Sequence, residues 1–166
     1  MGETTILYRE GSLGARRVLV AGLGKPADFS LEAARHASAA AARKVRDLGI
    51  TRFASIVHGA GAGEIDAGDA AQALVEGTIL GLYDFREHKT ESEEPPTVVE
   101  ELTIVEFDAN KLAALETGAR AGQIIAESTC LARDLVNQPA NCATPAILAE
   151  RARAIAEEVG LACRVL

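Results

Sequence analysis

The chain has 166 residues, a formal net charge of −7, 48% hydrophobic residues, 4% aromatic residues and no Trp. This length suits one domain able to bury about 70% of the surface that its unfolded form would expose. The acidic balance argues against nucleic-acid binding, which normally rests on a cationic surface, and no apolar run approaches the roughly 20 residues that span a bilayer.

The first third of the chain alternates strands with one helix. Residues 5–8 are a short strand candidate, and residues 16–22 (RRVLVAG) are a stronger one because β-branched apolar residues end in glycine. A turn follows at residues 22–26. Ser30 is expected to cap a helix that runs to Leu48.

The middle of the chain repeats this pattern. Residues 52–58 (RFASIVH) predict a buried strand, three glycines follow it, and residues 67–82 predict a helix. Residues 84–97 contain Pro95 and Pro96 and are predicted to form an exposed loop. The acidic charge concentrates here, since residues 84–108 hold nine acidic residues against two basic ones.

The last third is dominated by one long helix. Residues 98–107 predict a partly exposed strand, and small or apolar residues then recur at three- and four-residue steps over residues 110–136. Thr144 and Pro145 are expected to start a further helix that Gly160 stops. Residues 161–166 are expected to start another strand. Strands that alternate with helices predict an α/β domain with a mixed or largely parallel sheet covered on both faces.

Two glycine-rich loops are candidates for binding an anion. Residues 22–27 match G-x-G-x-x-A after a strand, but Pro26 removes one amide donor, and a structural turn is the favoured interpretation. Gly59, Gly61 and Gly63 follow the next strand and could form a nest of backbone amides for an anion or nucleotide. A flexible crossover is the favoured interpretation of these glycines too.

Metal or nucleophilic chemistry has little support in the sequence. His88 with Glu87 and Glu91 could trap a cation, but solvated loop residues are the favoured interpretation. Asp66 and Asp69 near a predicted helix start are expected to cap it. The three cysteines are odd in number and lack C-x-x-C spacing, and the N-terminus has no secretory signal pattern, so a reducing cytoplasmic location is expected.

The segment at the end of the long helix resembles a known family. STCLARDLVNQPANCATP is similar to the A-R-D-L-V-N-x-P-A-N-x-x-T-P run that closes the N-terminal domain of the leucyl (cytosol) aminopeptidase family. Residues 16–25 and 77–90 resemble two further stretches of that domain. The matching positions are Ala132, Arg133, Asp134, Leu135, Val136, Asn137, Pro139, Ala140, Asn141, Thr144 and Pro145.

The resemblance implies a three-layer α/β/α fold similar to macro domains, with residues 1–136 as the N-terminal domain and residues 137–166 as a linker and the start of a catalytic domain. The family's metal-binding motifs, G-K-G-x-x-F-D-S-G-G and N-T-D-A-E-G-R, do not occur in the sequence. The resemblance therefore implies no catalytic or metal-binding residue and no cofactor in this chain. Such a chain alone is expected to be inactive.

For the parent protein, the resemblance implies a peptidase that removes N-terminal amino acids from peptides with two divalent cations, Zn or Mn. Its implied partners are a C-terminal catalytic domain and further copies in a hexamer, with neither nucleic acid nor membrane. Two alternatives stay open. One is a macro-like module that binds ADP-ribose or another nucleotide over Gly59 to Gly63, and the other is a protein-interaction domain.

Overall fold

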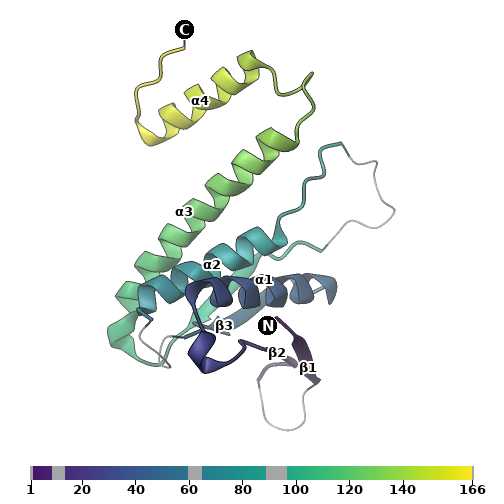
Figure 1. Ribbon diagram of the computed structural model, residues 1–166, viewed down its shortest axis with the longest axis vertical. Helices are drawn as coiled ribbons and strands as arrows, with labels where there is room; N and C mark the ends of the chain where they lie inside the picture. Colours follow the sequence, from purple (N-terminus) through teal and green to yellow (C-terminus); the bar gives the residue numbers. More distant parts are fainter. Residues whose placement is uncertain (1, 9–13, 60–64, 89–96, 166) are drawn as a thin grey trace. The chain divides into compact units, whose positions relative to one another are not determined.

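The computed structural model describes residues 2–8, 14–59, 65–88 and 97–165. Residue contacts divide the chain into two compact units, 1–129 and 130–166. In chain order the elements in Figure 1 are β1 (Thr4–Tyr8), β2 (Arg17–Ala21), the 3-10 turn η1 (Pro26–Asp28), α1 (Leu31–Asp47), β3 (Arg52–Ile56), α2 (Ala67–Leu82), β4 (Glu101–Val105), the 3-10 turn η2 (Ala109–Lys111), α3 (Leu112–Asn137) and α4 (Pro145–Val159).

Side chains outside the helices satisfy the first backbone amides, as the sequence predicts. Ser30 Oγ accepts a hydrogen bond from the Ala33 amide at 3.2 Å, and Asp66 Oδ1 accepts from the Gly68 amide at 2.8 Å. Thr144 Oγ1 does the same for the Ile147 amide at 3.4 Å. These caps fix where α1, α2 and α4 begin, because the first amides of a helix have no partner within it.

The strands form two pairs with different directions. β1 and β2 are antiparallel, with Ile6 opposite Leu19, whereas β3 and β4 are parallel, with Ser55 opposite Ile104. Parallel strands need a crossover connection, and the segment between β3 and β4 contains α2. The predicted strand over residues 98–107 is therefore present in its central part.

The core of the first unit lies between the β3–β4 pair and the helices. Val57, Leu74 and Leu115 are buried together with small residues of α2, and Leu102 and Ile104 of β4 pack against them. The alternate residues of the same strands point the other way, since successive side chains leave a strand on opposite faces. Ile56 is accordingly 61% exposed.

Glycines allow α2 to contact its neighbouring helices at the backbone. A Cβ on Gly77 would overlap the Arg35 carbonyl of α1, and one on Gly81 would lie 2.7 Å from the Ala39 Cα atom. Toward α3, a Cβ on Gly122 would lie 2.6 Å from the Gln72 carbonyl oxygen. Figure 1 shows α1 and α2 side by side. The close packing of small-residue helices follows from a composition rich in alanine and glycine and poor in aromatic residues.

The second unit consists of the end of α3, a turn and α4. Pro145 occupies the first turn of α4, and Gly160 ends the helix with a φ of 72°. Ala156 is the one buried residue that the structure describes in this unit. The strand predicted over residues 161–166 is wrong for the described residues 161–165, which adopt no regular structure. No neighbouring strand hydrogen-bonds to them among the described residues, and a β-strand needs such a partner.

The mixed α/β class is confirmed, together with the parallel strand pair and the long helix. The long helix predicted over residues 110–136 runs from Leu112 to Asn137, with Asn110 in the preceding 3-10 turn. The three-layer, macro-like arrangement and the domain boundary after residue 136 stay predictions. No helix within the described ranges has both the length and the apolar character needed to cross a membrane.

Candidate functional site

Gly59, the first of the three glycines after β3, packs against Phe29, which follows η1. Gly59 has a φ of 90°, a conformation that only glycine adopts readily. A Cβ at Gly59 would also overlap the ring of Phe29. Packing and backbone conformation thus account for this glycine without a ligand. Gly61 and Gly63 lie outside the described residues, so an anion or nucleotide site over these three glycines stays a prediction.

The loop at residues 22–27 forms a turn that leads into η1. Gly24 has a φ of 85°, and Pro26 is the first residue of the three-residue 3-10 turn. The helix α1 begins only after Ser30. The G-x-G-x-x-A match therefore does not open directly into a long helix, which is the context that a dinucleotide-binding fingerprint needs.

His58 lies between the end of β3 and Gly59. Burial lowers the pKa of His58 from its ordinary value of 6.5, because the charged ring loses its hydration. As the pH falls through 6.5, the unfolded chain is therefore protonated at His58 to a greater extent than the folded chain. The contribution of His58 to stability therefore falls as the pH falls through this range.

We expect acidification from about pH 8 to about pH 5 to destabilise the wild-type chain more than a His58→Gln variant. Urea unfolding at a series of pH values measures this difference. His36→Gln is the control, since His36 is exposed on α1 and its Nε2 lies 3.0 Å from Glu32 Oε1. Equal pH dependence in wild type and His58→Gln would contradict the assignment.

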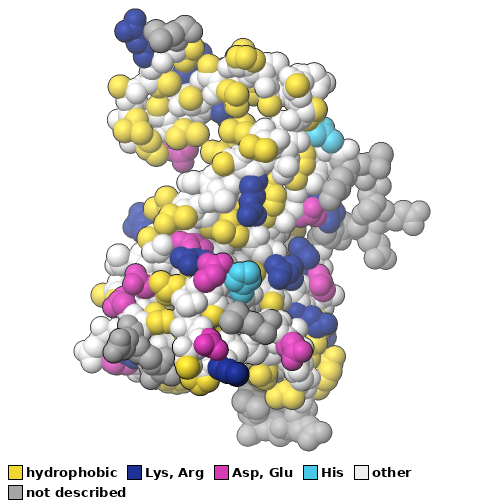
Figure 2. All heavy atoms as spheres, in the orientation of Figure 1, with side chains coloured by type: hydrophobic (Ala, Val, Ile, Leu, Met, Phe, Trp, Pro, Cys, Tyr) yellow, Lys and Arg dark blue, Asp and Glu magenta, His cyan; other side chains and the backbone are white. Residues whose placement is uncertain are grey.

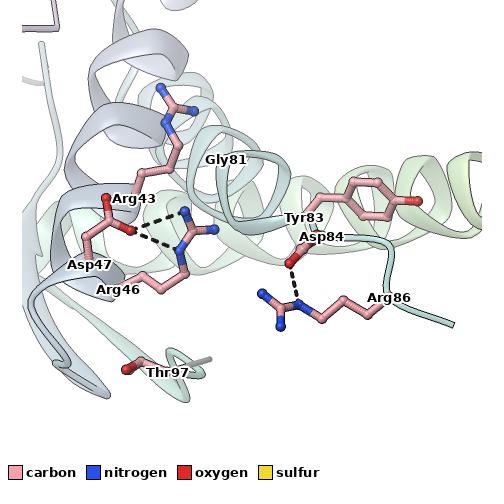
Figure 3. A pocket seen from close by; sticks show the side chains of 8 residues that line it. All are labelled: Arg43, Arg46, Asp47, Gly81, Tyr83, Asp84, Arg86 and Thr97. Carbon is pink, nitrogen blue, oxygen red and sulfur yellow. Dashed lines mark hydrogen bonds and ion pairs between the residues drawn. The ribbon is translucent and has the colours of Figure 1, made fainter. Parts of the chain in front are cut away.

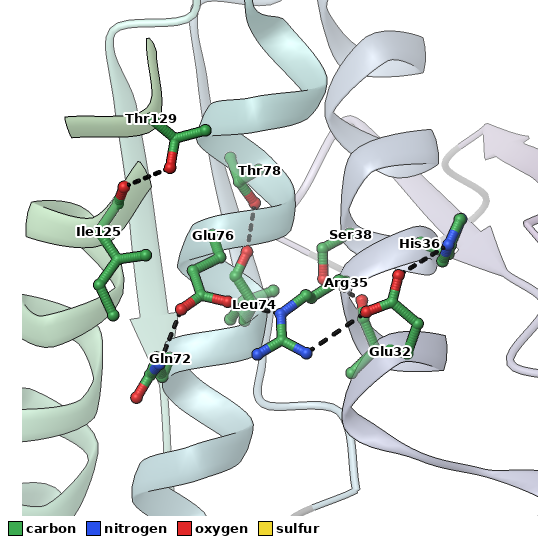
Figure 4. Close-up of polar contacts among 11 residues, drawn as sticks. Glu32, Arg35, His36, Ser38, Gln72, Leu74, Glu76, Thr78, Ile125 and Thr129 are labelled. Atoms are coloured by element: carbon green, nitrogen blue, oxygen red, sulfur yellow. Dashed lines mark hydrogen bonds and ion pairs between the residues drawn. The ribbon is translucent and has the colours of Figure 1, made fainter. Parts of the chain in front are cut away.

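A polar network that the sequence did not reveal joins α1 to α2 (Figure 4). Glu76 is only 5% exposed, and its carboxylate accepts hydrogen bonds from Arg35 Nε at 2.5 Å and from Gln72 Nε2 at 2.7 Å. The hydrogen bond to Glu76 is the main reason that the pKa of Arg35 is raised. Arg35 also reaches Glu32 at 3.4 Å. Glu76 is a single acidic residue within an apolar run of α2. This pattern could have indicated the network, because a buried carboxylate needs a partner.

The network is structural in character. Both carboxylate oxygens of Glu76 accept a hydrogen bond, and no buried side-chain nitrogen or oxygen atom among the described residues lacks a partner. Glu76 thus has its hydrogen bonds without a ligand. The network fixes α1 against α2 at the level where the Gly77 and Arg35 backbones touch.

A polar pocket lies near the C-terminal ends of α1 and α2 (Figure 3). Its volume is about 560 Å³, and its lining includes Arg43, Arg46, Asp47, Asp84, Arg86 and Thr97. The sequence places Arg43 and Arg46 near the end of the helix that is predicted to run to Leu48. It does not place Arg86 near them, because residues 86 and 46 are far apart in the chain.

Ligands for a metal ion do not converge within the part of the chain that the structure describes. No group of three or more His, Cys, Asp or Glu side chains there could hold an ion. Glu91, which the sequence placed near His88 and Glu87, lies outside the described residues. Asp66 serves as the cap of α2 and also accepts a hydrogen bond from the Asp69 amide at 3.3 Å.

Comparison with known proteins identifies the family. Residues 1–92 match the N-terminal domain of the cytosol aminopeptidase family. A probable cytosol aminopeptidase of Alkaliphilus metalliredigens is 35% identical over 99% of this chain and 33% of its own length. The bottromycin maturation enzyme BotP in complex with Mn has a TM-score of 0.80 and 29% identity, with 98% of this chain and 32% of BotP covered. A mutant of tomato leucine aminopeptidase has a TM-score of 0.73 and 26% identity, with 95% of this chain and 30% of the tomato enzyme covered.

These matches place the chain among the N-terminal domains of a family of metal-dependent peptidases. The chain belongs to the cytosol, or leucyl, aminopeptidase family and corresponds to its N-terminal domain. The chain spans about a third of the length of the curated relatives that it matches. The resemblance seen in the ARDLVNQPANCATP segment is confirmed.

Proposed function

We propose that the chain is the non-catalytic N-terminal domain of a leucyl aminopeptidase that removes N-terminal amino acids from peptides. The observation that carries this proposal is the family match over residues 1–92, in a chain that spans only a third of its relatives. The proposed role of the domain is assembly or access to the active site of the whole, cytoplasmic enzyme.

The two divalent cations of the proposed enzyme, Zn or Mn, would be held outside this chain. The described residues do not fit such a pair of ions, because each ion needs several side-chain donors that converge on one point, and no such group occurs among them. The similarity to BotP, whose structure was solved in complex with Mn, supports the metal class. No catalytic step is therefore assigned to a residue of this chain.

The partner of the second unit is proposed to be the C-terminal catalytic domain. This unit has little core of its own, since Ala156 is its one buried residue among those described. Val136 is 83% exposed and Val159 is 60% exposed, and Figure 2 shows hydrophobic side chains exposed over α4. Apolar surface of this kind favours burial against another part of the protein. A hexamer of the whole protein, as the family resemblance implies, is part of the same proposal.

An activity assay tests the non-catalytic role. We expect the purified chain to release no p-nitroaniline from leucyl-p-nitroanilide with Mn²⁺ or Zn²⁺ present. The full-length aminopeptidase of Alkaliphilus metalliredigens, assayed in the same buffer, is the positive control. Turnover by the chain alone that a chelator abolishes would overturn the proposal.

A further inference from the structure

The pocket at the ends of α1 and α2 brings together arginines from two parts of the chain. Arg43 and Arg46 belong to the last turns of α1, and Arg86 follows α2. Figure 3 shows Arg46 and Arg86 extending toward one another across the pocket. Guanidinium groups repel each other, so a shared counter-charge is the natural occupant of the space between them.

The carboxylates of the pocket neutralise only part of this charge. Arg46 Nε and Nη2 both lie 3.3 Å from Asp47 Oδ1, and Arg86 Nε pairs with Asp84. The Arg43 side chain makes no hydrogen bond or ion pair with another described residue. Among the described residues, the pocket is therefore lined by three guanidinium groups and two carboxylates, an excess of one positive charge in a chain whose net charge is −7.

Interaction with the C-terminal ends of the helices explains only in part why arginines gather here. Cationic side chains near a helix C-terminus complement its exposed carbonyls. In α1, however, backbone amides already bond the last carbonyls: Leu48 donates to Lys44, Gly49 to Arg46 and Ile50 to Val45. The Nη1 group of Arg46 and both Nη groups of Arg86 retain N–H donors that no described residue accepts.

From this arrangement we propose that the pocket binds a small polyvalent oxyanion. The planar edge of a guanidinium group presents parallel N–H donors that match two oxygens of one phosphate or carboxylate. The volume of about 560 Å³ accommodates a phosphorylated or polycarboxylate metabolite. Thr97 also lines the pocket. Such a site lies in the first unit and needs no part of the proposed peptidase reaction.

Titration calorimetry on the purified chain tests the proposal with inorganic phosphate and citrate as separate probes, against sodium chloride at equal ionic strength. We expect saturable binding of one anion per chain. Arg46→Gln and Arg86→Gln should each weaken it about tenfold, as expected for the loss of a charge-assisted hydrogen bond. The better probe identifies the oxyanion class, phosphate or carboxylate.

Three further variants distinguish a specific anion-binding site from non-specific electrostatic attraction. Arg153→Gln removes the same charge from exposed α4 and should leave binding unchanged. Arg43→Gln removes one positive charge from the pocket but no hydrogen bond or ion pair among the described residues, so it should weaken binding and leave the stability of the chain unchanged. Asp84→Asn removes one of the two negative charges that line the pocket among the described residues, and it should tighten binding. Absence of saturable heat with both probes, or equal weakening by Arg153→Gln, would overturn the proposal.

Discussion

Replacement of Gly118 by alanine is expected to destabilise the chain by about 3 kcal/mol, although alanine is the better helix former. Gly118 is buried on α3 and faces Gly68 of α2. A Cβ there would lie 2.6 Å from the Gly68 carbonyl carbon and closer still to its oxygen. The clash is with backbone, so α2 and α3 must separate to relieve it. Urea unfolding followed by circular dichroism measures the change.

The neighbouring Thr117 provides the matched control. Thr117 is exposed, and its hydroxyl donates only to the Ala113 carbonyl of its own helix. Thr117→Ala introduces the same residue one position away and should change stability by less than about 1 kcal/mol. A Gly118→Ala chain as stable as Thr117→Ala would show that α2 and α3 do not touch at the backbone.

Removal of the Arg35 side chain is expected to cost about 3 kcal/mol. Arg35→Ala leaves the Glu76 carboxylate, which is 5% exposed, with Gln72 as its remaining donor in the network. A buried carboxylate without its cationic partner loses hydration that nothing replaces. Urea unfolding of Arg35→Ala and of the double variant Arg35→Met with Glu76→Leu separates this effect. The double variant should recover most of the loss, because no buried charge remains.

Arg52 supplies the comparison at the surface. Its guanidinium lies 3.5 Å from Glu100 and 3.9 Å from Glu101, and its side chain is 68% exposed. Arg52→Ala should cost less than about 1 kcal/mol, since solvent screens exposed ion pairs. Equal losses for Arg35→Ala and Arg52→Ala would mean that burial of Glu76 contributes nothing to its pairing.

Local features of the fold were predictable from the sequence because they depend on neighbouring residues. Ser30, Asp66 and Thr144 carry side-chain oxygens that can reach amides three positions away, and each caps its helix in the structure. The bounds of α2 and the stop at Gly160 follow from the same local chemistry. The family resemblance was predictable too, since it rests on a contiguous run of residues.

Long-range features were not predictable by the same means. The sequence does not say which strands pair, so the division into one antiparallel and one parallel pair needed the structure. The sequence also does not show that Glu76 of α2 is paired with Arg35 of α1. The arginine pocket likewise joins residues more than thirty positions apart. The strand expected at residues 161–165 had the right composition but no partner among the described residues.

The glycines of α2 also constrain how this helix can change during evolution. Gly68 faces α3, whereas Gly77 and Gly81 face α1. At about 100° per residue, the nine positions from Gly68 to Gly77 turn the helix by about two and a half revolutions, which places the two contacts on opposite sides. Insertion or deletion of one codon between them would rotate one contact away by about 100°. Homologous sequences should therefore vary in residue identity along this segment but not in its length.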